Sequence, residues 1–390
     1  MVIKPIGNYV TLSQGLAINK GSAHLVSDTK KGKFILPLLR IADMMGNKYS
    51  KYISTDVTQN VIANTNDIIY TRTGQIGLVF RGFNGVVHNN SFIVTLNNNE
   101  LDKDYLFVLL QSNFFRNQAL SIAKNSVQPD LTHSMFKGIL IPVPSKEEQK
   151  NIANVYLTLT SRINNNNKIN AELESMAKTL YDYWFLQFDF PNENGKPYKS
   201  SGGRMVWSEE LKREIPEGWT ESTLSEISNM YQPNTFDAKL LEDDGKYRVY
   251  GAGGYMGQYH DFNHKESEIF ISCRGSCGDI YRSMPFSLIT GNAMIVHPNN
   301  IYLFEYLYLT LQRIGVKNCI TGSVQPQITR TSLNDWKLVV PSEKVVRHFK
   351  SIVEPIFKKQ ETIIEENSKL NSLRDFLLPM LMNGQISFNK

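Results

Sequence analysis

The chain has 390 residues, of which 41% are hydrophobic and 20% are charged, and its formal net charge at pH 7 is +5. This length predicts two or more domains rather than one core. The chain has no apolar run of about 18 residues and no basic-then-apolar leader, which predicts a soluble, cytoplasmic protein. The three cysteines, Cys273, Cys277 and Cys319, are too few for a disulfide framework and lack zinc-site spacing, so we expect no metal site.

The positive charge lies mainly in the first third of the chain. Residues 1–145 hold 14 Lys+Arg and 8 Asp+Glu, a balance of +6, whereas residues 217–341 hold 10 and 13, a balance of −3. A basic balance favours polyanionic partners such as nucleic acid. Charge therefore indicates a nucleic-acid partner for the first segment and gives no such indication for the later one.

Residues 1–144 are expected to form a mixed α/β domain. "NDIIYTRTGQIGLVF" and "SFIVTL" are β-branched and aromatic runs typical of strands, and "KDYLFVLLQSNFFRNQAL" has a helical pattern. An arginine at a glycine turn can bind a guanine edge or a phosphate, or equally hold its own loop. Lysine, Gln and Asn side chains suit DNA, but they also suit solvated loops and turns. The candidates here are Lys30, Lys31, Lys33, Arg72, Gln75, Arg81, Asn89, Asn90 and Gln128.

Residues 145–189 predict a long helix that begins at a capping box formed by Ser145 and Glu148. Its heptad seam, with steps of three and four, is expected to pair with another helix. The seam positions are Ile152, Val155, Leu159, Arg162, Asn166, Ile169, Leu173, Met176, Leu180 and Tyr183. The polar seam residues are interpreted as setting register and leave the direction of pairing open. "MAKTLYDYWFLQF" is aromatic on several faces, so Tyr181, Trp184, Phe185 and Phe188 are expected to bind a partner.

Residues 190–215 have the composition of a connector, and residues 216–341 predict a second mixed α/β domain. Its candidate DNA contacts are Tyr255, Arg274, Arg282, Asn292 and Gln325. Residues 342–390 predict a second long helix, which Ser342 can cap, followed by a tail. Its seam is predicted to contain Phe349, Ile352, Ile356, Lys359, Ile363, Glu366, Leu370, Leu373, Leu377 and Met380.

The two halves of the chain repeat each other. "SVQPDLTH" at 126–133 matches "SVQPQITR" at 323–330, and "YLFVLLQ" at 105–111 matches "YLYLTLQ" at 306–312. Leu12 is matched with Leu224, and Arg72 with Arg274. The offset between copies shrinks along the chain, which indicates one duplicated unit with deletions in loops.

Catalytic motifs are weak in this sequence. "YGAGGYMG" at 250–257 lacks the strand and helix that a dinucleotide site requires, so we interpret it as a glycine-dense turn. Asp237, Asp244 and Lys246 resemble a carboxylate–lysine nuclease pattern only faintly. The histidines His88, His260 and His264 are interpreted as loop residues. The sequence therefore predicts a binding protein and not an enzyme.

The order of these motifs around a duplication resembles the specificity subunit of type I restriction–modification systems. The resemblance covers essentially the whole chain and includes "ILIPVPSKEEQKNIANVY", both copies of "SVQP", "VYGAGGYMG" and "IPEGWTESTLSEI". The first domain lacks the "PEGW" opening of the second. The resemblance implies two target recognition domains, each followed by a long helix, with the helices paired as an antiparallel coiled coil.

The resemblance also implies the function. Each domain would read one half of a split double-stranded DNA site, and the coiled coil would set the gap between the halves. Two adenine methyltransferase subunits and two motor-nuclease subunits would bind, carrying S-adenosylmethionine, ATP and Mg²⁺, with no cofactor in this chain and no membrane contact. "SVQP" would mark the junction between domain and helix, and recognition would concentrate near residues 28–51 and 231–265. The alternative is a stand-alone two-domain DNA-binding protein.

Overall fold

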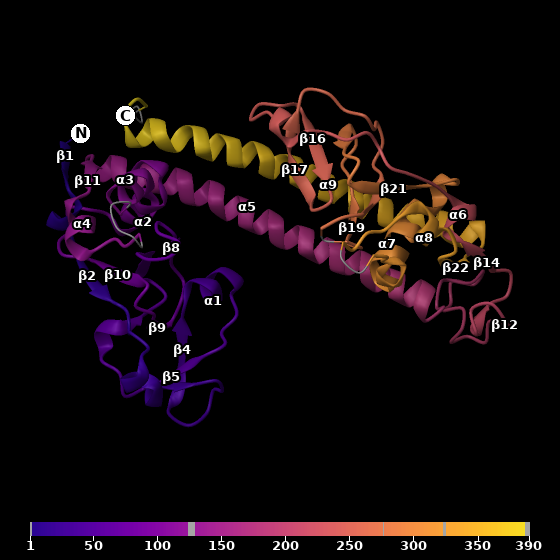
Figure 1. The fold of residues 1–390 in the computed structure, drawn as a ribbon, viewed down its shortest axis with the longest axis horizontal. Coiled ribbons are helices and arrows are strands. Elements are labelled where there is room, and N and C mark those ends of the chain that lie inside the picture. The colour runs from indigo at the N-terminus through magenta and orange to yellow at the C-terminus, as the bar shows by residue number, and fades with distance from the viewer. Residues whose placement is uncertain (1, 124–128, 276, 323–324, 387–390) are drawn as a thin grey trace. The chain divides into compact units, whose positions relative to one another are not determined.

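The computed structural model describes residues 2–123, 129–275, 277–322 and 325–386. The chain divides into two compact units (Figure 1): Met1–Asn165 with Asn367–Lys390, and Asn166–Glu366. Each unit holds one mixed α/β domain, called domain 1 and domain 2 below. Each also holds part of both long helices, α5 (Lys146–Tyr181) and α9 (Glu343–Met382).

Domain 1 is built on three antiparallel or mixed sheets among its described residues, in the orders β1-β11, β2-β10-β7-β8 and β3-β5-β4-β9-β6. Its strands are β1 (Val2–Pro5), β2 (Val10–Gln14), β3 (Val26–Ser27), β4 (Phe34–Leu39), β5 (Tyr52–Ser54), β6 (Ile62–Ala63), β7 (Ile68–Thr71), β8 (Val79–Phe80), β9 (Gly85–Val87), β10 (Ser91–Leu96) and β11 (Leu140–Val143). Its α-helices are α1 (Ile41–Gly46), α2 (Lys103–Gln111), α3 (Asn113–Ala123) and α4 (His133–Gly138).

Domain 2 uses sheets in the orders β14-β22, β15-β21-β18-β19 and β17-β16-β20. Its strands are β14 (Thr220–Thr223), β15 (Ser228–Tyr231), β16 (Tyr247–Gly251), β17 (Gly254–Tyr259), β18 (Ile269–Ser272), β19 (Ile280–Arg282), β20 (Ser287–Ile289), β21 (Ala293–Pro298) and β22 (Lys337–Val340). Its short α-helices are α6 (Leu224–Ile227), α7 (Phe304–Ile314) and α8 (Arg330–Asn334). The strands β7, β18 and β21 are near-continuous apolar runs, because each has one face in the main core of its domain and the other face in a second, smaller hydrophobic cluster.

The two domains repeat one sheet topology. In each, the first strand pairs with the strand that precedes the long helix, and a four-stranded sheet follows in the equivalent order. A parallel pair, β4 with β9 and β16 with β20, also recurs. Tyr105 of α2 donates its hydroxyl hydrogen bond to the carbonyl of Pro142 at 2.9 Å, and Tyr306 of α7 donates likewise to Val339. The predicted duplication is therefore confirmed.

Strand register corrects one residue match of the predicted repeat. Val94 of β10 pairs with Leu12, and the matching Val296 of β21 pairs with Met230. Leu12 therefore corresponds to Met230 and not to Leu224, which lies in helix α6. The short strings "VTLSQ" and "STLSE" are similar in letters, but they occupy different elements, because one forms a strand and the other ends a strand and starts a helix.

The two long helices run antiparallel. In the first unit, the guanidinium of Arg374 near the end of α9 lies 5.8 Å from the ring centre of Tyr156 near the start of α5. In the second unit, the side chain of Gln360 donates to the carbonyl of Asn170 at 3.3 Å. Later residues of one helix thus meet earlier residues of the other, which settles the direction that the seam pattern left open.

The start of each helix agrees with the predicted caps. The amide of Glu148 donates to the hydroxyl of Ser145 at 3.3 Å, and the Glu148 carboxylate accepts from the Ser145 amide at 3.1 Å. This is the reciprocal capping box. At α9, the carbonyl of Ser342 accepts from the amide of Val346 at 3.1 Å, which places Ser342 at the cap position.

The predicted seam is only partly correct. Ile152, Asn166, Phe349 and Ile363 are buried, but Ile169, Met176, Ile352 and Leu373 are exposed. The buried side chains also include Ile163, Ala177, Val353, Phe357 and Gln360, which the predicted seam omits. A straight helix drifts by about 20° per heptad relative to a strict seven-residue repeat, and both helices bury additional side chains against the domains.

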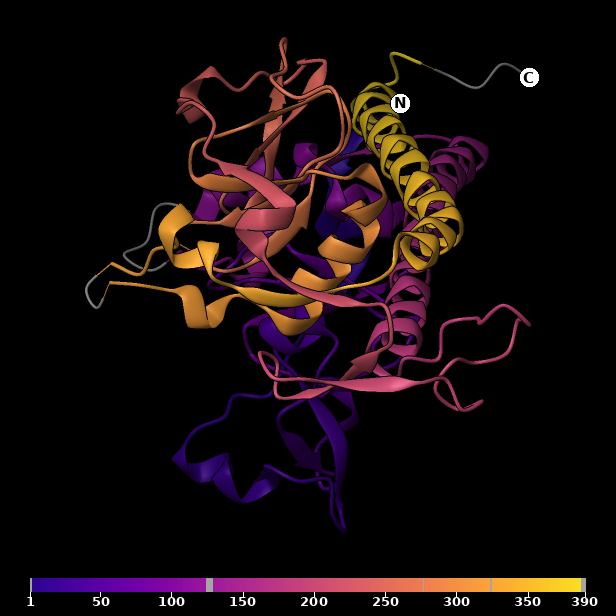
Figure 2. The same cartoon turned by 90° about the vertical axis from the view of Figure 1, so that its right-hand side faces the viewer.

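The segment predicted as a connector contains ordered structure. Within residues 190–215, β12 (Met205–Ser208) pairs with β13 (Arg213–Pro216, which extends one residue further) as a two-stranded hairpin. Before this segment, a π-helical turn (Asp182–Leu186) ends α5 inside the region predicted as the first long helix. Figures 1 and 2 show this hairpin near the end of α5 in the second unit. Phe188 and Ile215 share one hydrophobic cluster with Trp219, so the hairpin base packs on the start of domain 2.

Candidate nucleic-acid interface

Both domains form the same glycine turn after their central buried strand. Gly74 and Gly77 follow β7 with φ of 75° and 94°, and Gly275 and Gly278 follow β18 with φ of 74° and 93°. Glycine adopts this left-handed backbone without the penalty that a Cβ brings. The turn is therefore equivalent in the two domains, and its polar residues can be compared position by position.

Backbone bonds at this turn correct the predicted match between the two arginines. The amide of Arg72 donates to the carbonyl of Asn90 at 2.8 Å, and the amide of Cys273 donates to that of Asn292 at 3.0 Å. Arg72 therefore corresponds to Cys273. Arg274 lies one residue further along and is exposed. The similar letters of the two strings hide a one-residue shift.

Arg72 is held by its own domain. Its guanidinium forms an ion pair with Asp130 at 2.5 Å and donates to the carbonyls of Leu131 at 3.3 Å and Asn89 at 3.4 Å. It also lies 5.4 Å from the ring centre of Phe92, and its side chain is 14% exposed. Of the two interpretations, base contact or loop support, these contacts favour loop support.

Arg81 and Arg282 are also engaged inside the protein. Arg81 pairs with Asp104 of α2, and Arg282 pairs with Glu361 of α9 with a side chain only 10% exposed. The prediction that Arg282 contacts DNA is therefore not supported by its position. The sequence identified both arginines but could not show which acidic residues lie opposite them.

The three predicted lysines of domain 1 lie together on an exposed turn between β3 and β4. Lys31 and Phe34 exchange backbone hydrogen bonds, and Gly32 at φ 58° allows the tight reversal between them. Lys33 pairs with Asp56, whereas no ion pair of Lys30 or Lys31 occurs within the described residues. The turn belongs to the five-stranded sheet β3-β5-β4-β9-β6. This sheet and its three-stranded counterpart in domain 2, β17-β16-β20, are called the outer sheets below, and the sheets β2-β10-β7-β8 and β15-β21-β18-β19 are called the inner sheets.

The Gln and Asn residues predicted to contact DNA differ in their exposure to solvent. Gln75 is exposed on the glycine turn, and Asn89 and Asn90 are half-buried, with their backbone carbonyls or amides holding that turn. Asn292 and Gln325 are exposed. Gln128, and the Ser-Val part of both "SVQP" phrases, lie outside the described residues.

The glycine-dense stretch of domain 2 contains a turn, as predicted, and the structure shows that this turn joins the two strands of a hairpin. Gly251 of β16 pairs with Gly254 of β17, and two residues separate them. Tyr255 on β17 is 51% exposed, and the guanidinium of Arg248 on β16 lies 4.6 Å from its ring centre. A two-stranded ribbon with such a pair can enter a major groove. Sequence reasoning missed Arg248, although its alternation with buried Val249 within a strand is a readable signal.

The other weak motifs have structural roles. Asp237 accepts from the amide of Lys239 at 3.0 Å and caps a short 3-10 helix (Ala238–Leu240). Within the described ranges, no group of three His, Cys, Asp or Glu residues is arranged to hold a metal ion. Burial raises the pKa of the Cys273 thiol to about 11, so this cysteine is a poor nucleophile.

The four aromatic residues predicted to bind a partner form the chain's own core. Tyr181, Trp184, Phe185 and Phe188 are each at most 5% exposed. The ring centre of Phe185 lies 4.6 Å from Tyr306 of domain 2 and 4.7 Å from Phe349 of α9. The sequence correctly indicated a large apolar surface here, but the surface is buried by the chain's own second domain.

Comparison with known proteins gives consistent matches. The family model described as "Type I restriction modification DNA specificity domain" matches residues 5–175 and 216–372, which is most of the chain. The MjaIX specificity subunit of Methanocaldococcus jannaschii is 24% identical over 82% of this chain and 77% of its own length. The HindI specificity subunit of Haemophilus influenzae is 22% identical, covering 78% and 82% of the two chains.

A solved structure has the same fold. The S subunit of a type I restriction–modification system from M. genitalium aligns over 100% of this chain and 96% of its own, with a TM-score of 0.64 and 21% identity. Among the described residues, no helix is long and apolar enough to span a membrane.

Proposed function

Because the chain belongs to the family of type I restriction–modification specificity subunits, we propose that it reads a split, asymmetric DNA site with one domain on each half. The observation that carries this proposal is the contrast between the domains. Their inner sheets repeat strand for strand, whereas the outer sheets differ, with five strands in domain 1 and three in domain 2. A shared scaffold with different outer sheets suits the reading of two different half-sites.

The exposed residues of these outer sheets and of the glycine turns are the proposed DNA contacts. In domain 1 they are Lys30, Lys31, Lys33 and Gln75, and in domain 2 they are Tyr255 and Arg274. The half-buried Arg248 beside Tyr255 is added, as are Asn292 and Gln325, which are exposed but lie outside these elements. Lysines on a turn suit phosphates, which fix the position of a protein on the duplex. Arginine beside tyrosine on a ribbon suits base edges.

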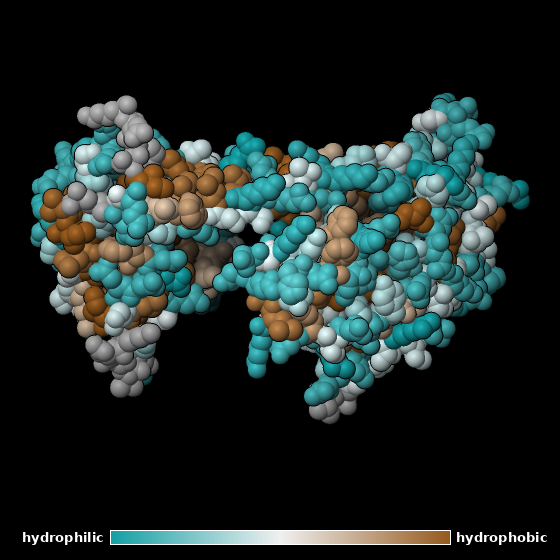
Figure 3. Space-filling model, turned by 90° about the horizontal axis from the view of Figure 1, so that it is seen from above, coloured by the Kyte–Doolittle hydropathy of each residue, from teal (hydrophilic) through white to brown (hydrophobic). Residues whose placement is uncertain are grey.

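The antiparallel helices are the proposed spacer and the proposed docking surface for methyltransferase subunits. Their exposed large hydrophobic residues are Ile169, Met176, Ile352, Leu373 and Phe376, and these replace the buried aromatic residues as candidate partner contacts. Figure 3 shows hydrophobic patches among hydrophilic side chains on one face of the molecule. Patches of this kind are typical of surfaces that bind other proteins.

The proposal places all chemistry in other subunits of a cytoplasmic complex. Two adenine methyltransferase subunits would bring S-adenosylmethionine, and two motor-nuclease subunits would bring ATP and Mg²⁺. This chain would supply sequence recognition and geometry. The absence of a recognisable catalytic motif in its sequence agrees with that division.

Adenine methylation mapped across the genome of a host tests the proposal. The chain is co-expressed with a type I methyltransferase subunit from the same source, and the control host carries the methyltransferase alone. We expect new methylation at one split motif, with one modified adenine in each half. Sequence-specific DNA binding by the purified chain, with no methyltransferase complex and no new methylation, would instead support the stand-alone DNA-binding protein.

A further inference from the structure

The two domains carry an arginine and an acidic residue at equivalent positions. Phe80 of β8 pairs with Ile69 of β7, and Tyr281 of β19 pairs with Phe270 of β18, so Phe80 and Tyr281 are equivalent. Arg81 and Arg282 follow them directly. The acidic residues, Asp104 and Glu305, each directly precede the tyrosine that bonds the last strand of its domain. In both copies the arginine and the acid therefore belong to the common framework.

In domain 1 the pair is closed within the domain. Arg81 forms an ion pair with Asp104, and its guanidinium lies 4.6 Å from the ring centre of Phe107 on the same helix. The two copies of the long helix are 197 residues apart in the sequence. The residues of α5 at the positions of Lys350 and Glu361 in α9 are therefore Ala153 and Asn164, which carry no charge. The two positions of α5 that correspond to Lys350 and Glu361 therefore cannot form the ion pairs seen in domain 2.

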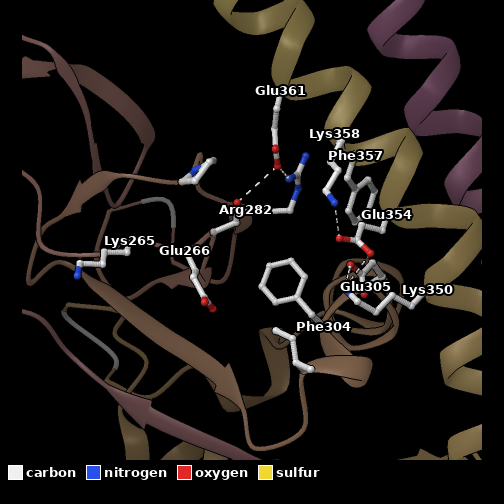
Figure 4. Close-up of a pocket in the computed structure, with 13 residues that line it drawn as sticks. Lys265, Glu266, Arg282, Phe304, Glu305, Lys350, Glu354, Phe357, Lys358 and Glu361 are labelled. Carbon is white, nitrogen blue, oxygen red and sulfur yellow. Dashed lines mark hydrogen bonds and ion pairs between the residues drawn. The ribbon is translucent and has the colours of Figure 1, made fainter.

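In domain 2 the same two positions are bonded to helix α9 instead (Figure 4). Arg282 pairs with Glu361, and its guanidinium lies 4.4 Å from the ring centre of Phe357. Glu305 pairs with Lys350 at 2.7 Å, and its side chain is 4% exposed. Lys350 also lies 3.5 Å from Glu354. Two ion pairs therefore join domain 2 to α9 where domain 1 has one internal pair.

These ion pairs flank a cavity between domain 2 and α9. The cavity has a volume of about 290 Å³, and its lining includes Pro285, Phe304 and Phe357 as well as the four paired residues. Figure 4 shows the paired side chains arranged around it. Closer to the start of α9, Val346, Phe349 and Val353 pack into the apolar core of domain 2. At the cavity, apolar packing is incomplete, and the two direction-dependent ion pairs add a constraint on the angle of the domain. Buried ionic groups can fix register in this way.

We propose that Arg282–Glu361 and Glu305–Lys350 form an ionic clamp that holds domain 2 at one angle on α9 and thereby makes the gap between the two DNA half-sites strict. This inference rests on the proposed function. Arg282 and Glu305 are positioning residues that act through the helix, without touching DNA. A gap one base pair longer or shorter shifts one half-site by about 3.4 Å along the duplex and turns it by about 35° around the axis. Domain 2 must therefore both rock and turn on α9 to accept such a gap, and the clamp opposes that movement.

The test compares methylation by the complex of this chain with its methyltransferase subunit on DNA sites whose gap is correct, one base pair shorter or one longer. With Arg282→Gln or Glu361→Gln, we expect the methylation rate at the altered gaps, relative to the correct gap, to rise at least tenfold, with both half-site sequences unchanged. The charge-exchanged double variant, Arg282→Glu with Glu361→Arg, is expected to restore strictness. The matched control is Arg81→Gln, which removes the internal pair of domain 1 and should leave the gap strict.

The results separate the clamp from general damage and from the proposed function. Unchanged strictness in both single variants would overturn the clamp. So would equal relaxation in Arg81→Gln, or loss of the domain 2 half-site in both single variants without recovery in the double variant. If the wild-type complex methylates no split site, the proposed function itself fails, and that outcome is visible before any variant is made.

Discussion

The residue directly after β7 in domain 1 and the equivalent residue after β18 in domain 2 have completely different side chains, although their backbones make the same hydrogen bond. Domain 1 has Arg72, whose charge is met by Asp130, and domain 2 has Cys273, which is 1% exposed and carries no charge at neutral pH. Both residues donate the same backbone bond to an asparagine carbonyl. The comparison teaches that main-chain bonds and buried apolar strands preserve this fold, while a buried charge is kept only where its partner is also present.

The largest expected effect follows from removing that charge. Arg72→Ala should lower the free energy of unfolding of domain 1 by about 2 kcal/mol, because hydrogen bonds to charged groups contribute about 1.5–3 kcal/mol each and Asp130 loses its partner. Arg274→Ala should change stability by less than about 0.5 kcal/mol, because its side chain is exposed. Hydrogen exchange of the β7 and β10 amides in the full chain measures the difference, and equal effects of the two variants would contradict the corrected register.

A second contrast concerns binding. Replacing Lys30 and Lys31 with glutamine should weaken DNA binding by the methyltransferase complex and reduce the slope of log affinity against log salt by up to about 2, since each phosphate contact contributes about 0.9. The double arginine variant keeps both charges and should retain the slope. Fluorescence anisotropy from 50 to 300 mM salt, conditions chosen on the same principle, is the measurement. An unchanged slope in the glutamine variant would remove these lysines from the interface.

The paired tyrosines test where the domains are alike. Tyr105→Phe and Tyr306→Phe each remove one buried hydroxyl and leave a strand carbonyl without that donor. Each should destabilise its own domain by about 1 kcal/mol, which is the usual net value of one hydrogen bond. Urea unfolding of the full chain, followed by hydrogen exchange in each domain, compares them. Markedly unequal costs would show that the two copies use this bond differently.

The smallest expected effect is on pH dependence. Burial lowers the pKa of His264 below its usual 6.5, and its ring bonds Tyr231 at 3.0 Å and Asn263 at 2.6 Å. The unfolded chain then binds a proton more readily than the folded one, so stability is present above about pH 6.5 and falls as the pH drops through the folded pKa. His264→Gln should flatten this fall in domain 2, as thermal unfolding between pH 7.5 and 5.5 would measure. A steeper fall in the variant would contradict the sign.

Sequence reasoning reached the framework but not the residue contacts. The duplication followed from repeated strings in the two halves of the chain. The capping box at Ser145 and the turn between Gly251 and Gly254 followed from local patterns, because turns and caps depend on neighbouring residues. The choice between the two roles that the sequence left open for Arg72, and the core position of Trp184, did not follow in this way. Their partners, Asp130 and the core of domain 2, are far away in the chain, and no local pattern indicates which distant residue will lie opposite a side chain.

The predicted seam of the helices was only partly correct for a related reason. A seven-residue pattern identifies a helix that pairs, but the face that each helix turns to its own domain depends on tertiary packing. Phe357 illustrates this, because it contacts Tyr308 of domain 2 at 5.6 Å between ring centres and lies outside the predicted seam. The outer sheets also escaped prediction in detail, since their strands are short and their loops differ in length between the copies.

The central claim is that each domain reads its own half of the DNA site, and a domain exchange tests it most directly. Residues 1–144 are replaced by the first domain of a type I specificity subunit whose target is known, and the methylated motif is mapped after co-expression with the methyltransferase subunit. The account predicts a hybrid motif in which one half comes from the donor, the other half is unchanged, and the gap is kept. A change in both halves, or in neither, would contradict it.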